Sequence, residues 1–236
     1  MSDMAAISAL AEPTRRALYD HLAAAGDWVS RDEAADAVGL ERATAAHHLD
    51  RLAADGLVEV DYQRRSGRQG PGAGRPAKLY RRARREFDLA LPPREYALAG
   101  RMLAEAVDRA RTDGTDIAAA VDEVASSEGR RLGEEIDERL RRERARKTES
   151  RRRGVLDALA DHGFEPHTDE HGSVVLRNCP FHQLAQQHTD LICGMNLCMV
   201  KAALAEVGDT GLDAHLEPEV GQCCVRLTPQ SQARPR

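Results

Sequence analysis

The sequence predicts a mainly α-helical chain with α+β parts, and three observations support this fold class. Of the 236 residues, 42% are hydrophobic and 31% are charged, a balance that allows the chain to bury a core. Only 3% are aromatic, so the core must be built from Ala, Leu and Val, mostly in helices. Apolar residues recur at helical spacing over most of the chain, and short strand-like segments stand between these stretches.

Three helices are predicted first, over residues 7–25, 30–38 and 41–54, because apolar side chains recur there every three or four positions. The second helix begins with Ser30 and Glu33, which form the Ser-x-x-Glu pattern of a capping box. A glycine follows each helix closely and is expected to end it.

Two strands are predicted next, over residues 57–62 and 77–81. They are joined by a loop over residues 63–76 that is rich in Gly, Arg and Pro. Three short helices followed by a hairpin with a long basic tip are typical of a winged helix-turn-helix. We expect this domain to cover residues 1–90.

The distribution of charge indicates a partner for this domain. The net charge of the chain is −5, but residues 64–85 contain nine basic residues and no acidic one. A basic wing favours contact with the phosphates of double-stranded DNA, while the exposed face of the third helix favours contact with bases in the major groove. The expected DNA-binding residues are Arg42, Thr44, His47 and Arg51 on the third helix, and Arg65, Arg68, Arg75 and Lys78 on the wing. His48 borders the buried face of that helix and is expected to pack inside the domain.

Two further helices are predicted after the Pro pair that follows Leu91. They cover residues 99–110 and 117–140, and the second is expected to loosen around Ser126 and Gly129. Their apolar stripes lie on otherwise charged helices and need a partner surface. We expect residues 91–150 to form a helical linker and dimerisation region; packing on the chain's own C-terminal domain is the alternative.

Residues 151–236 are expected to form a small α+β domain. Strands are predicted over residues 173–176, 213–216 and 223–227, and helical material over residues 181–207. A domain of this size has a limited core, and a bound metal would help to stabilise it.

The cysteines of the chain all lie in this last domain, at Cys179, Cys193, Cys198, Cys223 and Cys224. Thiolates that converge from separate elements are suited to zinc or to an iron-sulfur cluster, and Cys179, Cys193 and Cys223 are the expected ligands. Cys224 should face the opposite way from Cys223 on a strand, and Cys198 is expected to be a small core residue. The candidates for a fourth ligand are Cys224, His182 and His188.

The N-terminal sequence resembles bacterial winged-helix regulators related to the ArsR and DeoR families. The resemblance spans about residues 8–85 and implies the fold and DNA binding. It is carried by Glu41-Arg42-Ala43-Thr44-Ala45-Ala46-His47-His48-Leu49-Asp50-Arg51-Leu52, by Gly56-Leu57-Val58 and by Gly74-Arg75-Pro76-Ala77-Lys78-Leu79-Tyr80.

The C-terminal sequence resembles the corresponding domain of SufR-type iron-sulfur regulators. The resemblance is carried by Asn178-Cys179-Pro180-Phe181, followed by His188, Cys193 and Cys223. Those regulators are repressors that bind a [4Fe-4S] cluster and control iron-sulfur assembly operons, so the resemblance implies that the three cysteines are cluster ligands. The chain departs from some members in having no cysteine between Cys198 and Cys223.

These observations predict a homodimeric, DNA-binding transcriptional regulator, expected to be a repressor of a palindromic operator. Its C-terminal domain is expected to bind a [4Fe-4S] cluster, or zinc as the alternative cofactor, and so to change DNA affinity. A metal-free thiol redox switch and a regulator that responds to a small ligand are alternatives. An enzyme with Cys179 or Cys193 as nucleophile and His182 or His188 as base has no family signature to support it.

The location of the protein is expected to be cytoplasmic. No apolar run approaches the roughly 18 residues of a membrane span, which excludes a transmembrane protein. Residues 1–4 lack the basic and apolar regions of a signal peptide.

Overall fold

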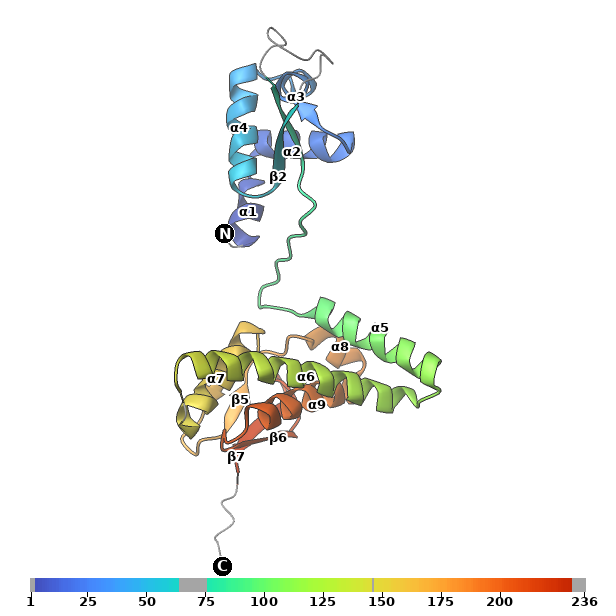
Figure 1. The fold of residues 1–236 in the computed structure, drawn as a ribbon, viewed down its shortest axis with the longest axis vertical. Helices are drawn as coiled ribbons and strands as arrows, with labels where there is room; N and C mark the ends of the chain where they lie inside the picture. The colour runs from blue at the N-terminus through green and yellow to red at the C-terminus, as the bar shows by residue number, and fades with distance from the viewer. Residues whose placement is uncertain (1–2, 64–75, 146, 231–236) are drawn as a thin grey trace, which may run out of the picture. The chain divides into compact units, whose positions relative to one another are not determined.

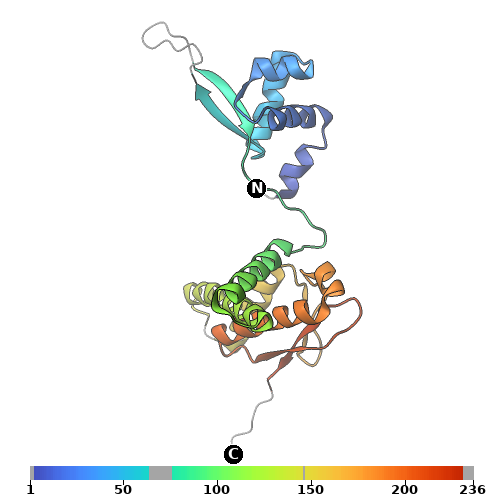
Figure 2. The same ribbon diagram turned by 90° about the vertical axis from the view of Figure 1, so that its right-hand side faces the viewer.

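The computed structural model describes residues 3–63, 76–145 and 147–230, in two compact units, Met1–Leu89 and Ala90–Arg236 (Figures 1 and 2). Each unit has a hydrophobic core of its own. The boundary between the units falls close to the predicted end of the first domain.

The N-terminal unit packs four helices against a small sheet. Its antiparallel strands have the order β1-β3-β2. The elements are α1 (Asp3–Ala9), α2 (Pro13–Ala25), β1 (Val29–Ser30), α3 (Arg31–Val38), α4 (Arg42–Ala54), β2 (Val58–Gln63) and β3 (Ala77–Arg82). The core is formed by the apolar faces of all four helices together with Val29, Leu57, Val58 and Tyr80.

The predicted first helix is two helices, because the chain breaks between α1 and α2. Proline has no backbone N–H to donate and disfavours helical backbone in the residue before it, so Pro13 begins a new helix. The Glu12 side chain caps this helix by accepting hydrogen bonds from the backbone N–H groups of Thr14 (2.9 Å) and Arg15 (2.8 Å).

The second and third predicted helices are present as α3 and α4. Ser30 and Glu33 form the complete capping box at the start of α3, as predicted. On α4, Ala45, Leu49 and Leu52 are buried on one face, which matches the predicted stripe. The two-residue strand β1 was not predicted, because two residues are too short to show an alternating pattern.

The C-terminal unit stacks helices on one antiparallel sheet of order β4-β5-β7-β6. Its elements are α5 (Tyr96–Asp113), α6 (Ile117–Arg142), α7 (Thr148–Asp161), β4 (Pro166–Thr168), β5 (Val174–Leu176), α8 (His182–Gln187), α9 (Thr189–Val207), β6 (Leu212–Leu216) and β7 (Val225–Pro229). Helix α9 packs on β6 and β7, α6 packs on α9, and α5 packs on α6 (Figure 1).

Helix α6 is continuous, so the expected loosening around Ser126 and Gly129 is wrong. The small residues serve instead to bring two helices together. A Cβ atom on Gly129 would lie 2.1 Å from the carbonyl oxygen of Met199 on α9, and one on Gly133 would lie 2.5 Å from Cβ of Glu206. Glycine is therefore required at both positions by the close approach of α9.

The expectation that residues 91–150 form a separate linker region is corrected by the structure. Helices α5 and α6 share one hydrophobic core with α7, α9 and the sheet, so residues 91–150 belong to the same compact unit as residues 151–230. The apolar side chains of α6, such as Leu132 and Ile136, are covered within this unit. The alternative of packing on the chain's own C-terminal domain is the observed arrangement.

Candidate DNA-binding surface and thiol cluster

The outer face of α4 carries the predicted DNA-contacting side chains of the third helix. Arg42, Thr44, His47 and Arg51 are all exposed, and they stand away from the stripe that α4 buries. A helix that presents polar side chains on one face and is fixed by its opposite face is suited to enter the major groove.

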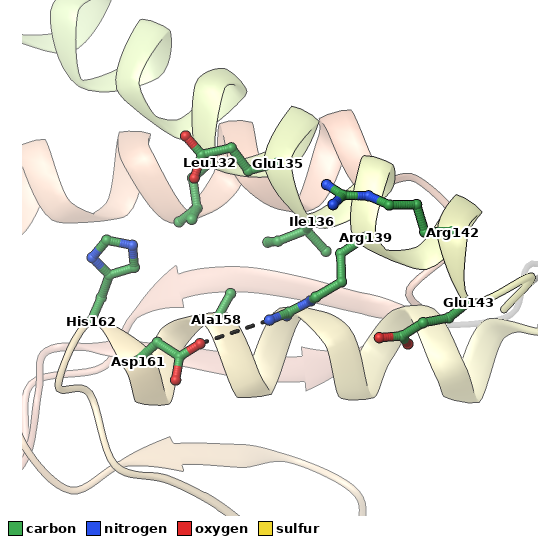
Figure 3. A pocket seen from close by; sticks show the side chains of 9 residues that line it. All are labelled: Leu132, Glu135, Ile136, Arg139, Arg142, Glu143, Ala158, Asp161 and His162. Carbon is green, nitrogen blue, oxygen red and sulfur yellow. Dashed lines mark ion pairs between the residues drawn. The ribbon is translucent and has the colours of Figure 1, made fainter. Parts of the chain in front are cut away.

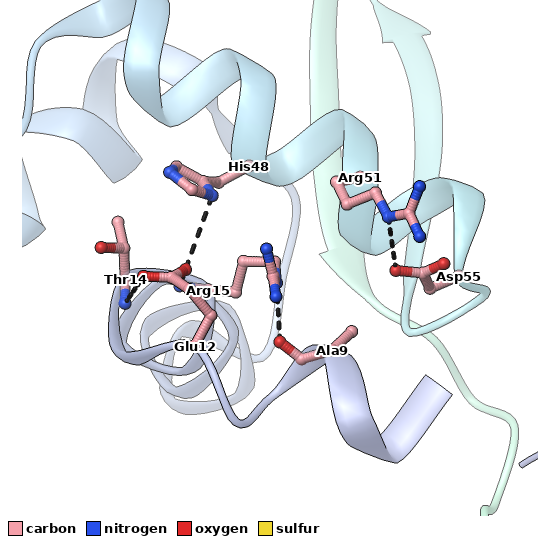
Figure 4. A network of polar contacts seen from close by, with 7 residues as sticks. All are labelled: Ala9, Glu12, Thr14, Arg15, His48, Arg51 and Asp55. Atoms are coloured by element: carbon pink, nitrogen blue, oxygen red, sulfur yellow. Dashed lines mark hydrogen bonds and ion pairs between the residues drawn. The ribbon is translucent and has the colours of Figure 1, made fainter. Parts of the chain in front are cut away.

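Several polar contacts lie around the start of α2 and the facing side of α4 (Figure 4). His48 on α4 is half-buried, and its Nδ1 atom lies 3.6 Å from the Glu12 carboxylate that caps α2. Arg15 donates from Nε to the Ala9 carbonyl oxygen at 2.6 Å and so ties α2 to the end of α1. The backbone hydrogen bonds from Thr14 and Arg15 lower the pKa of Glu12 to about 2. His48 therefore has a structural position, as predicted.

The two arginines of this face have acidic neighbours of different kinds. Arg42 lies 2.6 Å from Asp32, and both side chains are more than half exposed. An exposed ion pair of this kind contributes little stability, so the guanidinium is available to a phosphate or a base. Arg51 lies 3.1 Å from Asp55, whose side chain is only 7% exposed. The Asp55 contact orients Arg51 on the helix.

Lys78 is held by the protein itself. Its Nζ atom lies 2.6 Å from Oδ1 of Asp50, which also accepts a hydrogen bond from the Tyr80 hydroxyl at 2.7 Å. Partial burial opposes ionisation of Asp50, but the hydrogen bonds from Lys78 and Tyr80 lower its pKa. Lys78 thus joins β3 to α4 at the base of the wing.

Other basic residues of β3 and the segment after it are also paired. Arg81 lies 2.7 Å from Glu59 and 4.5 Å from the centre of the Trp28 ring, and Arg85 pairs with Asp3. The positive charge expected from the sequence is therefore reduced by acidic partners from other elements. The predicted wing contacts Arg65, Arg68 and Arg75 lie outside the described residues.

Four of the five cysteines gather at one end of the sheet in the C-terminal unit. We call Cys179, Cys193, Cys223 and Cys224 the thiol cluster. Cys179 follows β5, Cys193 lies in the first half of α9, and the last two precede β7. The Cys223 N–H donates to the Leu176 carbonyl oxygen at 2.8 Å, which brings the start of β7 beside the end of β5.

The thiol cluster consists of two pairs. A hydrogen bond with Cys223 lowers the pKa of Cys179 against the effect of burial, and the backbone N–H of Phe181 and the charge of Arg94 act in the same direction. The same bond, together with burial, raises the pKa of Cys223. Burial, and then a hydrogen bond with Cys224, raises the pKa of Cys193.

The prediction that Cys224 faces away from the other thiols is wrong. Cys223 and Cys224 precede β7 and lie outside any strand, so the alternation of side chains on a strand does not apply to them. Cys224 contacts Cys193 and is the fourth-ligand candidate that the structure brings to the other cysteines. The other two candidates for a fourth ligand have different surroundings: His182 contacts Gln186, and His188 is exposed between α8 and α9.

Cys198 lies outside the thiol cluster. Its thiol donates to the Asp122 carboxylate at 3.5 Å, and it packs partly buried against the hydrophobic core. This position agrees with the expectation that Cys198 serves packing.

Asn196 is a polar residue of this site that was not predicted from the sequence. Its side chain is 2% exposed, and Nδ2 donates to Sγ of Cys223 at 3.3 Å. Its Oδ1 atom is buried and has no hydrogen-bond partner within the part of the chain that the structure describes. The sequence feature that could have identified this residue is an asparagine one helical turn after Cys193, within the apolar stretch of α9.

The chemistry of these groups fits a soft metal or an iron-sulfur cluster, because thiolates are the preferred ligands of both. The orphaned oxygen of Asn196 also indicates a site that is not filled by protein atoms alone. Within residues 3–63, 76–145 and 147–230, no three His, Cys, Asp or Glu side chains are already placed to hold one metal ion. The two thiol pairs would have to close around a single ion.

A separate surface pocket of about 360 Å³ lies between α6 and α7 (Figure 3). Its floor is apolar, with Leu132, Ile136 and Ala158, and its rim carries charges of both signs. Arg139 and Asp161 face each other across it at 3.8 Å. None of the residues predicted from the sequence as site residues lines this pocket.

Comparison with known proteins supports the assignment of the first unit. Residues 10–61 match a family model described as a helix-turn-helix domain. No curated protein and no solved structure matches the chain. Among the described helices, none is both long and apolar enough to cross a membrane. The chain therefore carries a helix-turn-helix domain, as predicted, and this domain is typical of DNA-binding transcriptional regulators.

Proposed function

We propose that the protein is a transcriptional repressor that binds a palindromic operator as a homodimer and holds a [4Fe-4S] cluster on its thiol cluster. DNA binding rests on the helix-turn-helix match over residues 10–61 and on the exposed face of α4. The sensory role rests on one observation, the meeting of four thiols from three separate segments.

For DNA binding, each group on α4 has a role that follows from its position. Arg42, in the first turn of α4, exchanges its exposed partner Asp32 for a guanine edge or a phosphate. Thr44 and His47 donate to bases or phosphates from the same face. Arg51 lies in the third turn of the helix and is oriented by Asp55, which favours a contact with the DNA backbone.

A dimer is proposed because two copies of α4 would read two half-sites. Val107 on α5 and Ile117 at the start of α6 are both about half exposed, at 47% and 49%, and offer apolar surface to a second copy. Light scattering of the purified protein measures this directly, and a monomeric mass at the concentrations that bind DNA would contradict the dimer.

For the sensor, Cys179, Cys193 and Cys223 would hold the cluster and Cys224 would be the fourth thiolate. When bound, the group supplies an oxidation-sensitive redox centre. A tetrahedral zinc site needs four ligands within about 2.0–2.3 Å of one ion, whereas a cluster distributes its ligands over several irons. The arrangement as two thiol pairs therefore favours a cluster over zinc.

The C-terminal unit provides a route from the thiols to the rest of its core. Cys193 lies on α9, and α9 meets α6 at backbone distance through Gly129 and Gly133. A change in the position of α9 on cluster binding would therefore displace α6 and α5. Couplings between two sites in a protein are typically about 1–3 kcal/mol, or roughly 5–150-fold in affinity.

The proposal is tested with protein purified without oxygen. We expect absorbance from thiolate-to-iron charge transfer, matching amounts of iron and acid-labile sulfide, and a DNA affinity for its own promoter region that differs between the loaded and the cluster-free forms. A colourless protein that contains no iron, even after anaerobic reconstitution, would exclude the cluster.

Two alternatives predict different results in that experiment. A metal-free redox switch predicts loss of free thiols on mild oxidation and a change in DNA affinity without iron. The pairing of the thiols supports this alternative, because oxidation joins thiols that lie next to each other. A small-ligand response is favoured by the pocket between α6 and α7 and predicts that Arg139→Ala changes regulation without changing iron content.

A further inference from the structure

Two asparagines are buried beside the thiol cluster, and their hydrogen bonding differs. Asn178 donates from Nδ2 to the carbonyl oxygens of Pro93 and Gly163, and its Oδ1 accepts from Arg94. Every polar atom of that amide is paired, which is the usual state of a buried amide with a structural role. Among the described residues, the Asn196 side chain has one partner, the sulfur of Cys223, and its Oδ1 has none.

The surroundings of Asn196 do not call for a polar residue. Met195, Met199 and Val200 on the same helix are all buried in the hydrophobic core. An apolar side chain with the same branching, such as leucine, would present no unpaired oxygen here, although leucine is larger than asparagine. The one interaction that the amide makes, with Cys223, is therefore the feature that distinguishes asparagine from leucine here.

The backbone places this amide between two of the thiols. Asn196 follows Cys193 by three residues and so lies one turn further along α9, on the same side of the helix. Cys223 is held by its N–H bond to Leu176 at the end of β5. The Asn196 amide thus bridges α9 to the segment that carries Cys223 and Cys224.

We propose that Asn196 is a positioning residue of the metal or cluster site, whose amide N–H stabilises and orients the ligating sulfur of Cys223. This inference rests on the proposed function of the thiol cluster. A thiolate accepts a hydrogen bond more strongly than a thiol does, so the bond gains strength when Cys223 becomes a ligand. Partners of this kind orient metal ligands, and their loss typically reduces metal affinity about 10–100-fold.

The test uses Co²⁺ as an optical probe of the full-length, reduced, metal-free protein under anaerobic conditions. Two variants remove the amide N–H donor: Asn196→Leu replaces the amide with an apolar side chain of the same branching, and Asn196→Asp keeps the size and shape. We expect both to bind Co²⁺ about 10–100-fold more weakly than the unaltered protein. We also expect the sulfur-to-cobalt absorption band to move to longer wavelength, because the sulfur loses a hydrogen bond.

Thr210→Val is the matched control. Thr210 is a buried polar residue just before β6, at the end of that strand away from the thiol cluster. Its Oγ1 accepts a hydrogen bond from the Leu212 N–H. This variant should bind Co²⁺ with unchanged affinity and an unchanged band.

The outcomes separate this inference from the proposed function. Unchanged Co²⁺ affinity and band position in both Asn196 variants would overturn the role of Asn196 and leave the metal site standing. Unaltered protein that binds neither Co²⁺ nor iron would overturn both. Failure of both variants to fold, with Thr210→Val folded, would make Asn196 a core structural residue and overturn the inference as well.

Discussion

The two units of the chain place their functional side chains in opposite environments. In the N-terminal unit, the candidate residues are exposed on one face of α4, and the residues that hold α4 lie behind them. In the C-terminal unit, the candidates are thiols, three of them buried, that come from three segments. An exposed face can be predicted from helical spacing alone, whereas a convergence of buried groups depends on how separate elements pack.

The largest effect is expected from the thiol cluster, where the position of a cysteine should decide whether it holds the iron-sulfur cluster. Cys223→Ser should remove all bound iron and sulfide, because it deletes a ligand that contacts both Cys179 and Asn196. Cys198→Ser is the matched control and should keep the iron content, since Cys198 contacts Asp122 instead. Iron and sulfide analysis of anaerobic preparations decides the matter, and equal loss in the two variants would show that the cluster is not confined to the four thiols.

The next effect concerns the exposed face. Arg42→Ala should weaken binding to the target DNA by about 1–3 kcal/mol, or roughly 5–150-fold, if Arg42 contacts a guanine. Arg142→Ala on α6 is a control with a similarly exposed arginine in the other unit, and its effect should be negligible. Fluorescence anisotropy at fixed salt concentration measures both. Equal affinities for Arg42→Ala and the unaltered protein would remove α4 from the DNA interface.

A third prediction addresses the stability of the C-terminal unit alone. Gly129→Ala should destabilise it by about 1–3 kcal/mol, because the new methyl group meets the Met199 carbonyl oxygen. Gly100→Ala on α5 is the control: open space surrounds that position, so replacing glycine in a helix should stabilise the unit by about 0.5–1 kcal/mol. Chemical denaturation followed by circular dichroism distinguishes the two signs.

The smallest effect is a pH dependence confined to the N-terminal unit. The pKa of Glu12 is lowered from 4.5 to about 2, so its stabilising effect is fully present above pH 4.5 and is lost as the pH falls from 4.5 towards 2. Glu12→Gln should therefore reduce the thermal midpoint of this unit at pH 6 and flatten its decline in acid. The single tryptophan, Trp28, lies in this unit, so its fluorescence follows the transition. A parallel acid profile in both proteins would show that the carboxylate cap does not stabilise α2.

Much of the fold was predictable because the determining signals are local. The capping box at Ser30, the buried stripe of α4 and the ends of most helices are features of neighbouring residues. The break at Pro13 was also local but was missed, because the apolar spacing continues through it. The continuity of α6 was not local: Gly129 weakens an isolated helix, and only the approach of α9 explains it.

The site divides in the same way. The exposure of Arg42, Thr44, His47 and Arg51 followed from the helical period. The pairing of Lys78 with Asp50 did not, because it joins residues 28 positions apart on different elements. Cys224 and Asn196 were misjudged or missed for a related reason, since the first depends on where β7 begins and the second on the approach of Cys223 to α9.

The crossing of α6 and α9 has a mechanical meaning. Side chains normally act as a compliant layer between helices, since they change rotamer and take up small displacements. At Gly129 and Gly133 that layer is missing, and backbone or Cβ atoms lie where a side chain would otherwise be. The joint between α6 and α9 is therefore stiff. A shift of α9 at its cysteine-bearing end would be passed on by this joint to α6 instead of being lost in side-chain rearrangement.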